Sequence, residues 1–276
     1  MGIVFCLVMI TLMLIKPGIT TGAARDALRV WGLDVAPSLF PYMVLCRLVA
    51  SRLQKTGIPA APAAAVLGLL GGSPSGAATL SGYAEGLNTQ QVRLLAALTG
   101  TISPMFLLNA VKLWSGDPRL CRLLLASHLS GAIFALVCTV FLTHGQKKSA
   151  CQGASVSSGN PITESVQSIL SVGGCIVFFS VLAAGLRALL PRLGLLPGAL
   201  LHAALEISGG LHSLCALQIA PGIRAVCMAA ASGFSGLSIL MQNHLFLRPL
   251  GLTFSELLFF ALLRAFGAGV MMAFLF

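Results

Sequence analysis

The sequence Gly-Gly-Ser-Pro-Ser-Gly at residues 71–76 interrupts an apolar stretch that runs from Pro59 to Tyr83. The apolar arms on its two sides have about 12 and about 8 residues, and at 1.5 Å per residue neither arm crosses a hydrocarbon core of about 30 Å. Glycine, proline and serine favour a turn between the arms. We therefore predict a re-entrant hairpin, which enters a membrane and returns to the same side, with its tip at Ser73–Gly76.

The composition of the whole chain also indicates a membrane protein. Hydrophobic residues make up 57% of the 276 residues and charged residues 9%, whereas a soluble chain carries roughly 25% charged residues. The mean hydropathy is +0.95. The net charge of +10 does not indicate nucleic-acid binding, because the 17 lysines and arginines punctuate apolar runs and form no basic face. We expect these residues at the lipid headgroups of a bilayer.

Further apolar stretches set the organisation of the chain. Those long enough to span a membrane are Leu28–Ala50, Leu120–Thr143, Val166–Leu190 and Phe254–Phe276. Those broken by Gly, Pro and Ser are Pro59–Tyr83, Val92–Trp114, Pro197–Ile219 and Ile223–Leu247. Met1–Ile15 has no basic residue before its apolar run, which favours an uncleaved membrane segment. The predicted parts are an N-terminal segment (1–29), a first repeat (30–143), a polar linker (144–163) and a second repeat (164–276).

A gapless shift of 133 residues overlays the two halves: Ser75-Gly76 falls on Ser208-Gly209, Thr99-Gly100 on Ser232-Gly233, and Asn109 on Gln242. Each half then has a long helix, a re-entrant hairpin, a broken helix and a second long helix. The tip of the second hairpin is expected at Ser208–Gly210. Because each half crosses the membrane three times, the second half is inverted relative to the first. The predicted fold class is an all-α polytopic membrane protein with two inverted repeats, the plan of many secondary transporters.

The four breaks, at residues 71–76, 99–104, 207–210 and 232–236, are the candidate binding site. Non-helical backbone within a bilayer is tolerated only inside protein or beside a water-filled cavity, and helix N-termini follow each break. The alternative is that Gly and Ser simply allow close helix packing. The candidate substrate-binding residues are Ser73, Ser75, Gly76, Thr99, Ser103, Asn109, Glu206, Ser208, Gly209, Ser235, Gly236, Ser238 and Gln242. Asn109 and Gln242 fit two roles equally well, binding a polar ligand or bonding a neighbouring helix.

Glu206 is an acidic residue inside an apolar segment, Leu200–Ile207, directly before a break. An intramembrane carboxylate is a functional candidate for coupling protons or cations or for binding a substrate. His202, one helical turn earlier, is either its proton partner or a polar packing residue. Arg264 interrupts the last helix and is either the charge partner of Glu206 or a snorkelling side chain.

Catalysis is not expected. Gly233-Phe-Ser-Gly236 matches the GxSG of rhomboid-type intramembrane proteases, but no histidine follows His244, so no later helix supplies a base. The spacing of His202, Glu206 and His212 is not that of HExxH, and nothing resembles a P-loop. The eight cysteines include no CxxC. We therefore predict no catalytic residue, no metal and no cofactor.

Several motifs resemble the YlbJ-type sporulation integral membrane proteins. In the first half these are GLLGGSPSGA (68–77), RLLAAL (93–98) and SPMF (103–106); in the second half they are LEISGG (205–210) and GFSGLSILMQ (233–242). Arg264 matches a family arginine in the last helix. The resemblance runs from about Trp31 to Phe276. Two residues depart from the family motif, Thr99 in place of an Asn and Ala97 in place of a Phe.

The resemblance implies a nucleoside-recognition or gate domain, similar to the core of concentrative nucleoside transporters. It also implies a role in endospore formation, in the mother-cell or forespore membrane of a Gram-positive bacterium. We expect a multi-pass cell-membrane protein, transporter-like, with a site in the middle of the bilayer for a small polar solute of nucleoside-like chemistry or an ion. The alternative is a non-transporting scaffold for assembly of the spore envelope or cortex. The expected partners are the solute and the lipid bilayer, with no nucleic acid; a homo-oligomer is left open.

Overall fold

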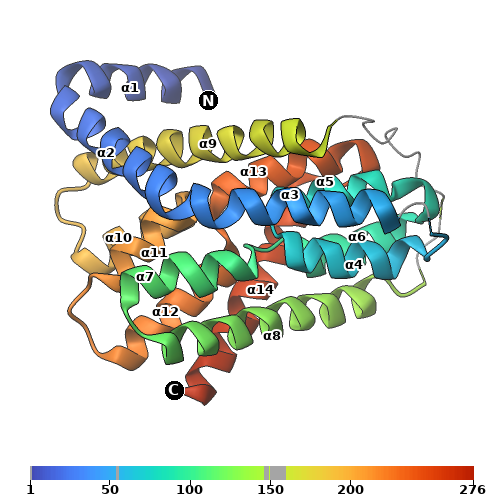
Figure 1. Cartoon of the computed structure of the whole chain (residues 1–276). Helices are drawn as coiled ribbons and strands as arrows, with labels where there is room; N and C mark the ends of the chain where they lie inside the picture. Colours follow the sequence, from blue (N-terminus) through green and yellow to red (C-terminus); the bar gives the residue numbers. More distant parts are fainter. Residues whose placement is uncertain (1, 54–55, 146–148, 150–159) are drawn as a thin grey trace.

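The computed structural model describes residues 2–53, 56–145, 149 and 160–276, and every regular element in them is a helix (Figure 1). In chain order the elements are α1 (Gly2–Ile15), α2 (Pro17–Arg29), η1 (Val30–Val35), α3 (Ala36–Leu53), α4 (Ala60–Gly71), α5 (Ser75–Gly82), η2 (Ala84–Gly86), α6 (Thr89–Thr99), η3 (Phe106–Ala110), α7 (Val111–Ser115), α8 (Pro118–Thr143), α9 (Pro161–Leu189), α10 (Leu195–Leu205), α11 (Ile207–Cys215), α12 (Pro221–Phe234), α13 (Gly236–Leu247), η4 (Arg248–Leu250) and α14 (Phe254–Leu275). The prediction of an all-α chain is confirmed.

Five helical segments in the described part of the chain are long and apolar enough to cross a membrane. They are Pro17–Leu53, Pro118–Thr143, Pro161–Leu189, Pro221–Leu250 and Phe254–Leu275. They contain or overlap the long apolar runs expected from the sequence, and they are consistent with a multi-pass membrane protein. Helix α1 is apolar but has 14 residues, and at 1.5 Å per residue it is shorter than a hydrocarbon core of about 30 Å.

Polar residues fix where the long helices begin. The Asp117 side chain accepts hydrogen bonds from the backbone N–H groups of Arg119 (2.8 Å) and Leu120 (3.1 Å) at the start of α8. Asn160 does the same for Ile162 (2.9 Å) at the start of α9. Helix α9 therefore begins at Pro161, and residues 161–163, which we expected in the linker, form its first turn. Most of the predicted linker, residues 146–148 and 150–159, lies outside the described residues.

The helices run mostly along one direction in Figure 1, so the chain turns at two opposite ends. One end, on the left, holds the connections α1–α2, α7–α8, α9–α10 and α11–α12. The other end holds the finish of α3, the starts of α4, α6 and α9, and the connection of α13 to α14. The pairs α4–α5 and α10–α11 each enter from one end and turn back near the middle.

The turn of the second pair is not where the sequence suggested. We expected a tip at Ser208–Gly210, but these residues lie in the first turn of α11. The chain is extended at Glu206 instead (φ −141°, ψ 118°). The reason is that the Glu206 carboxylate caps the N-terminus of α11, so the helix starts directly after it.

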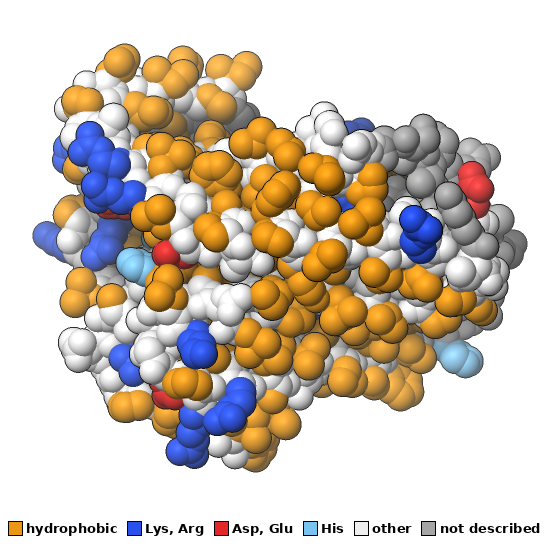
Figure 2. All heavy atoms as spheres, in the orientation of Figure 1, with side chains coloured by type: hydrophobic (Ala, Val, Ile, Leu, Met, Phe, Trp, Pro, Cys, Tyr) orange, Lys and Arg blue, Asp and Glu red, His pale blue; other side chains and the backbone are white. Residues whose placement is uncertain are grey.

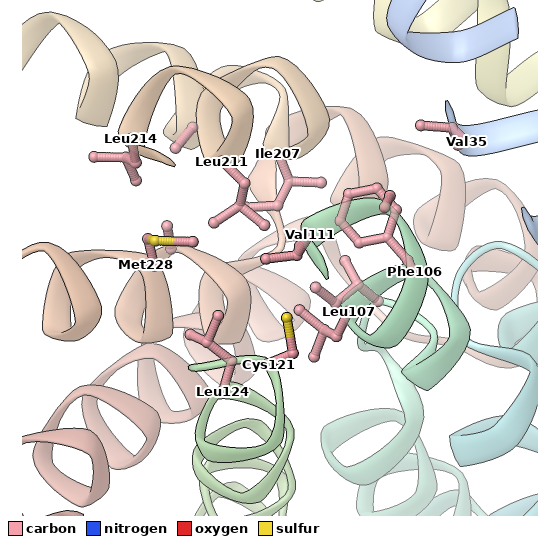
Figure 3. Packing of buried hydrophobic residues seen from close by; sticks show 14 of the residues in the cluster. Val35, Phe106, Leu107, Val111, Cys121, Leu124, Ile207, Leu211, Leu214 and Met228 are labelled. Atoms are coloured by element: carbon pink, nitrogen blue, oxygen red, sulfur yellow. The ribbon is translucent and has the colours of Figure 1, made fainter. Parts of the chain in front are cut away.

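A buried apolar cluster joins the two halves of the chain. Figure 3 shows Phe106 and Leu107 of η3, Val111 of α7 and Leu124 of α8 facing Ile207, Leu211 and Leu214 of α11 and Met228 of α12. The first and second halves therefore share one core. The outer surface in Figure 2 is mostly hydrophobic over its middle, and basic side chains gather toward the end at which α1 meets α2.

Candidate functional site

The candidate site is a small cavity in the middle of the molecule, which we call the central cavity. It has a volume of about 30 Å³, enough for one or two water molecules. Its wall combines the α4–α5 turn, the gap between α6 and η3, the start of α11 and the face of α13, closed by η1, α3 and α9. The lining residues are Val35, Leu39, Ser73, Ile102, Ser103, Phe106, Val172, Ile176, Glu206, Ile207, Ser208, Ser238, Ile239 and Gln242.

The polar part of this wall consists of residues that the sequence singled out. Six of the candidate binding residues line the central cavity: Ser73, Ser103, Glu206, Ser208, Ser238 and Gln242. They come from both halves of the chain and from three of the four breaks. The fold therefore brings together groups that lie up to about 170 residues apart in the sequence.

Other candidate residues lie beside the breaks but not on the cavity wall. Ser75 and Ser235 are buried, and the Ser235 hydroxyl donates to the backbone oxygen of Ser232 (3.0 Å). Thr99 is buried, and its hydroxyl donates to Leu95 O (2.8 Å). These hydroxyls lie in helix packing, the alternative that the sequence left open. Two glycine candidates, Gly76 and Gly236, likewise do not line the central cavity.

Asn109 does not join its repeat partner Gln242. Gln242 is buried on the cavity wall, whereas Asn109 is exposed, and its amide lies 3.9 Å from the sulfur of Met105. The reason is local: residues Phe106–Ala110 form a π-helix, whose wider turn changes which residues share a face. Phe106 occupies the cavity-facing position instead.

The Glu206 carboxyl group caps the N-terminus of α11. Its side chain is 1% exposed. One carboxylate oxygen accepts from the backbone N–H of Ser208 (2.8 Å) and the other from that of Gly209 (2.6 Å). Charge-assisted bonds of this kind, together with the positive end of the helix dipole, stabilise a carboxylate without a basic partner.

Two polar atoms of the central cavity have unused hydrogen-bonding capacity. Ser73 Oγ and Gln242 Oε1 are buried, and no partner lies within hydrogen-bond distance of either among the described residues. A buried polar atom without a partner costs about 1–3 kcal/mol. The two atoms, one from each half of the chain, are therefore positions at which a water molecule or a polar ligand would be stabilised.

Arg264 does not form the ion pair with Glu206 that was one of the two roles expected from the sequence. It is 1% exposed and lies on α14, where its guanidinium donates to Ala97 O (3.1 Å) and to Gly233 O (3.3 Å). These carbonyls belong to the last turns of α6 and α12, where the helix itself leaves oxygens unpaired. The reason for the missing ion pair is that each charge is satisfied by backbone at a helix end. Arg264 thereby connects the half-helices of both halves.

A second, larger cavity opens at the end of the molecule where α9 meets α10, and we call it the vestibule. Its volume is about 480 Å³, within the range of small-molecule sites. It lies among α2, η1, α9, α10 and α11. Its polar lining residues are Asp26, Arg29, Asp34, Ser180, Arg187, His202, His212 and Ser213. Gly209 and Ile176 also line the vestibule, and Ile176 lines the central cavity as well.

His202 lies in this vestibule. Its Nε2 atom is 3.2 Å from the hydroxyl of Ser180, and its Nδ1 atom is 3.5 Å from that of Ser213. The candidate proton partner of Glu206 thus faces the vestibule from α10 and does not line the central cavity.

Most residues of the vestibule could not be identified from the sequence. Its residues come from five elements, and no short motif joins them. One signal was available: Asp34 is an acidic residue inside the apolar stretch Leu28–Ala50, the same criterion that selected Glu206. Its carboxylate accepts a hydrogen bond from Trp114 Nε1 (2.7 Å), which fixes η1 against α7.

No protein-family model matches the chain, and no curated protein or solved structure matches it either. The resemblance to the sporulation proteins therefore stays a prediction carried by the motifs.

Proposed function

We propose that this protein is a membrane transporter for a small polar solute, with the central cavity as its binding site. The observation that carries the proposal is the convergence of Ser73, Ser103, Glu206 and Gln242, from both halves of the chain, on one buried cavity. A carboxylate and unpartnered polar atoms are costly to bury in an apolar chain, and a polar solute bound between them would offset that cost.

The inverted repeat is part of the proposal. The shift of 133 residues relates the two halves in the sequence, and in Figure 1 the pair α4–α5 turns back toward one end of the molecule whereas α10–α11 turns back toward the other. We assign these pairs as the two re-entrant hairpins, with α6–α7 and α12–α13 as the broken helices. In this plan the binding site lies between the repeats, near the middle of the bilayer.

The two cavities suggest how a solute reaches the site. At about 30 Å³ the central cavity has room for one or two water molecules, whereas the vestibule of about 480 Å³ is large enough for a solute of nucleoside size. Ile176 of α9 lines both cavities. A movement of α9 against α10–α11 that displaces Ile176 would join them, as alternating access requires.

The motif resemblance supports a nucleoside-like solute and a role in the mother-cell or forespore membrane of an endospore-forming bacterium. The Ser and Gln groups of the central cavity fit a neutral polar solute, because they offer hydrogen-bond donors and acceptors. The proposal includes no catalytic step and no cofactor.

One observation favours the second candidate, a scaffold for assembly of the spore envelope. The centre of the molecule is close-packed apart from about 30 Å³, and a scaffold needs no larger cavity. The two functions differ in one measurable property, since only a transporter changes the distribution of solutes across a membrane.

The test is solute uptake by the purified protein in liposomes. Proteoliposomes are incubated with a mixture of polar metabolites that includes nucleosides, and their contents are compared by mass spectrometry with those of empty liposomes. We expect at least one polar solute to accumulate with the wild-type protein and to be lost in Gln242→Leu. The matched control is Asn109→Leu, which removes an amide on the exposed face and should preserve uptake. Equal contents in wild-type and empty liposomes would reject transport in favour of the scaffold.

A further inference from the structure

His202 is the side chain of the vestibule nearest to the Glu206 carboxylate along α10 and α11. It precedes Glu206 by one helical turn, and the backbone N–H of Glu206 donates to His202 O (2.7 Å). Its ring lies against Gly209, whose own N–H donates to Glu206 Oε2 (2.6 Å). The histidine ring and the glutamate carboxylate thus both lie beside Gly209.

Gly209 has no side chain, and this lets the His202 ring pack directly against it. A Cβ atom on Gly209 would lie 2.6 Å from His202 Nε2, 2.5 Å from His202 Cε1 and 3.3 Å from Glu206 Oε2. The His202 Nε2 and Glu206 Oε2 atoms therefore flank the same point beside Gly209 and are at most about 5.9 Å apart. A rotation of the ring toward Oε2, or one bridging water molecule, would join them.

From this arrangement we propose that Glu206 exchanges protons with the vestibule through His202, which makes the proposed transport proton-coupled. The coupling to transport rests on the proposed function, whereas the proton path itself rests on the contacts of His202, Gly209 and Glu206. It assigns His202 a transfer role and Gly209 a positioning role.

The proton balance is simple. A hydronium ion in the vestibule gives its proton to Nδ1, on the side of Ser213, and becomes water, while the proton on Nε2 passes to Glu206 Oε2. The ring ends neutral with its tautomer changed; Nδ1 then releases a proton to water beside Ser213 and Nε2 takes one from water beside Ser180, which restores it. Each carboxylate oxygen has a second lone pair, so the backbone bonds at Glu206 leave room for the proton.

Other charged groups face the same path. Asp26 and Arg29 of α2, Asp34 of η1, Arg187 of α9 and His212 of α11 line the vestibule around His202. Burial of the ring, and then electrostatic repulsion from Arg187 and His212, disfavour a long-lived imidazolium, which suits a residue that passes a proton on. On its far side Glu206 has the Cys175 thiol of α9 within electrostatic range.

Rapid-mixing infrared spectroscopy tests this inference without any solute. The protein in lipid nanodiscs is moved from high to low pH, and the C=O stretching band of the protonated Glu206 side chain, identified by its absence in Glu206→Gln, is followed in time. His202→Gln keeps hydrogen bonds to the neighbouring serines but does not relay a proton, and Gly209→Ala adds a methyl group that displaces the His202 ring. We expect each change to slow the appearance of the band by at least about tenfold. The control His244→Gln, a histidine outside both cavities, should leave the rate unchanged.

Three results would overturn the proton path: an unchanged rate in His202→Gln, an equal slowing in His244→Gln, or a wild-type protein that shows no Glu206 band at any pH. Failure of solute uptake with a slowed band in His202→Gln would instead reject transport and retain the proton path. Uptake that persists with an unaffected band would retain transport and reject the path.

Discussion

Two buried charges, Glu206 and Arg264, show two uses of the same physical device. Each side chain is 1% exposed, and each is satisfied by backbone groups at helix ends. Glu206 binds the N–H groups at the start of α11, and Arg264 binds carbonyl oxygens at the finish of α6 and of α12. Anions favour helix N-termini and cations favour C-termini, so each charge sits at the end that suits it.

The difference between the two regions lies in what surrounds the charge. Glu206 is on the wall of the central cavity, whereas Arg264 lines neither the central cavity nor the vestibule. Arg264 binds one helix of each half, so its loss separates parts of the molecule; Glu206 binds only its own helix, so its loss changes a site. We infer that Arg264 stabilises the fold and that Glu206 serves the proposed function, and the following predictions test this division.

The largest effect is expected for Arg264→Met. The change leaves Ala97 O and Gly233 O without their donor in a buried region, and each hydrogen bond to a charged group contributes about 1.5–3 kcal/mol. The midpoint of thermal unfolding in detergent should fall steeply, with loss of folded protein on size-exclusion chromatography. Arg264→Lys retains the charge but not the planar fork and should recover only part of the stability.

Arg122→Met is the control, because Arg122 is an exposed arginine on α8. If Arg264→Met unfolds at the same temperature as Arg122→Met, the structural role of Arg264 is wrong.

A smaller loss is expected for Gly233→Val, which tests the same region without touching the charge. A Cβ atom at Gly233 would lie 2.6 Å from Arg264 O and 2.8 Å from Arg264 C, so α12 and α14 have to move apart. Overpacking of this kind costs roughly 1–3 kcal/mol. Gly174→Ala is the matched control, since Gly174 is a helical glycine with nothing within 4 Å of its Cβ position. The comparison is made by thermal unfolding, and equal midpoints for both variants would contradict the close crossing.

The Arg264 region also shows where reasoning from the sequence stops. Clusters of Gly, Pro and Ser identify the breaks because these residues together favour turns, and six candidate residues at or beside the breaks do reach the cavity. The partner of Arg264 could not be found in this way. Its acceptors are the backbone oxygens of Ala97 and Gly233, and the side chains at those positions carry no sign of the contact.

Asn109 does not face the central cavity for a related reason. A repeat in the sequence assigns equal faces to residues at equal offsets only while both helices keep the same period. The π-helix at Phe106–Ala110 breaks that condition in the first half, whereas the residues around Gln242 stay in a regular α-helix. The position of the Glu206 turn was missed by two residues, because a carboxylate cap starts a helix earlier than its glycines suggest.

For the Glu206 region we expect moderate loss of stability and large loss of function. Glu206→Gln keeps one acceptor oxygen for α11 and turns an amide N–H₂ toward the other backbone N–H, which costs about 1–3 kcal/mol. Thermal unfolding should therefore change less than in Arg264→Met, while solute uptake should lose its dependence on a pH gradient. A variant that takes up solute at the wild-type level across pH would remove the coupling role of Glu206.

The smallest effect is expected at Ser235, between the two regions. Ser235 ends α12 two residues after the carbonyl that Arg264 binds, and it adopts a left-handed conformation (φ 70°) that costs a non-glycine residue about 1–2 kcal/mol. Ser235→Ala keeps this cost and loses the hydrogen bond to Ser232 O, so its unfolding free energy should fall by about 0.5–1.5 kcal/mol. Ser235→Gly loses the same bond but relieves the backbone, and its stability should stay within about 1 kcal/mol of the wild type. If Ser235→Gly is less stable than Ser235→Ala, the hydroxyl and the left-handed turn do not offset each other.

Because the Ser235 hydroxyl hydrogen is already donated to a carbonyl, we also expect no labelling of Ser235 by a fluorophosphonate probe. Labelling that disappears in Ser235→Ala would indicate a nucleophile and favour an intramembrane protease over a transporter.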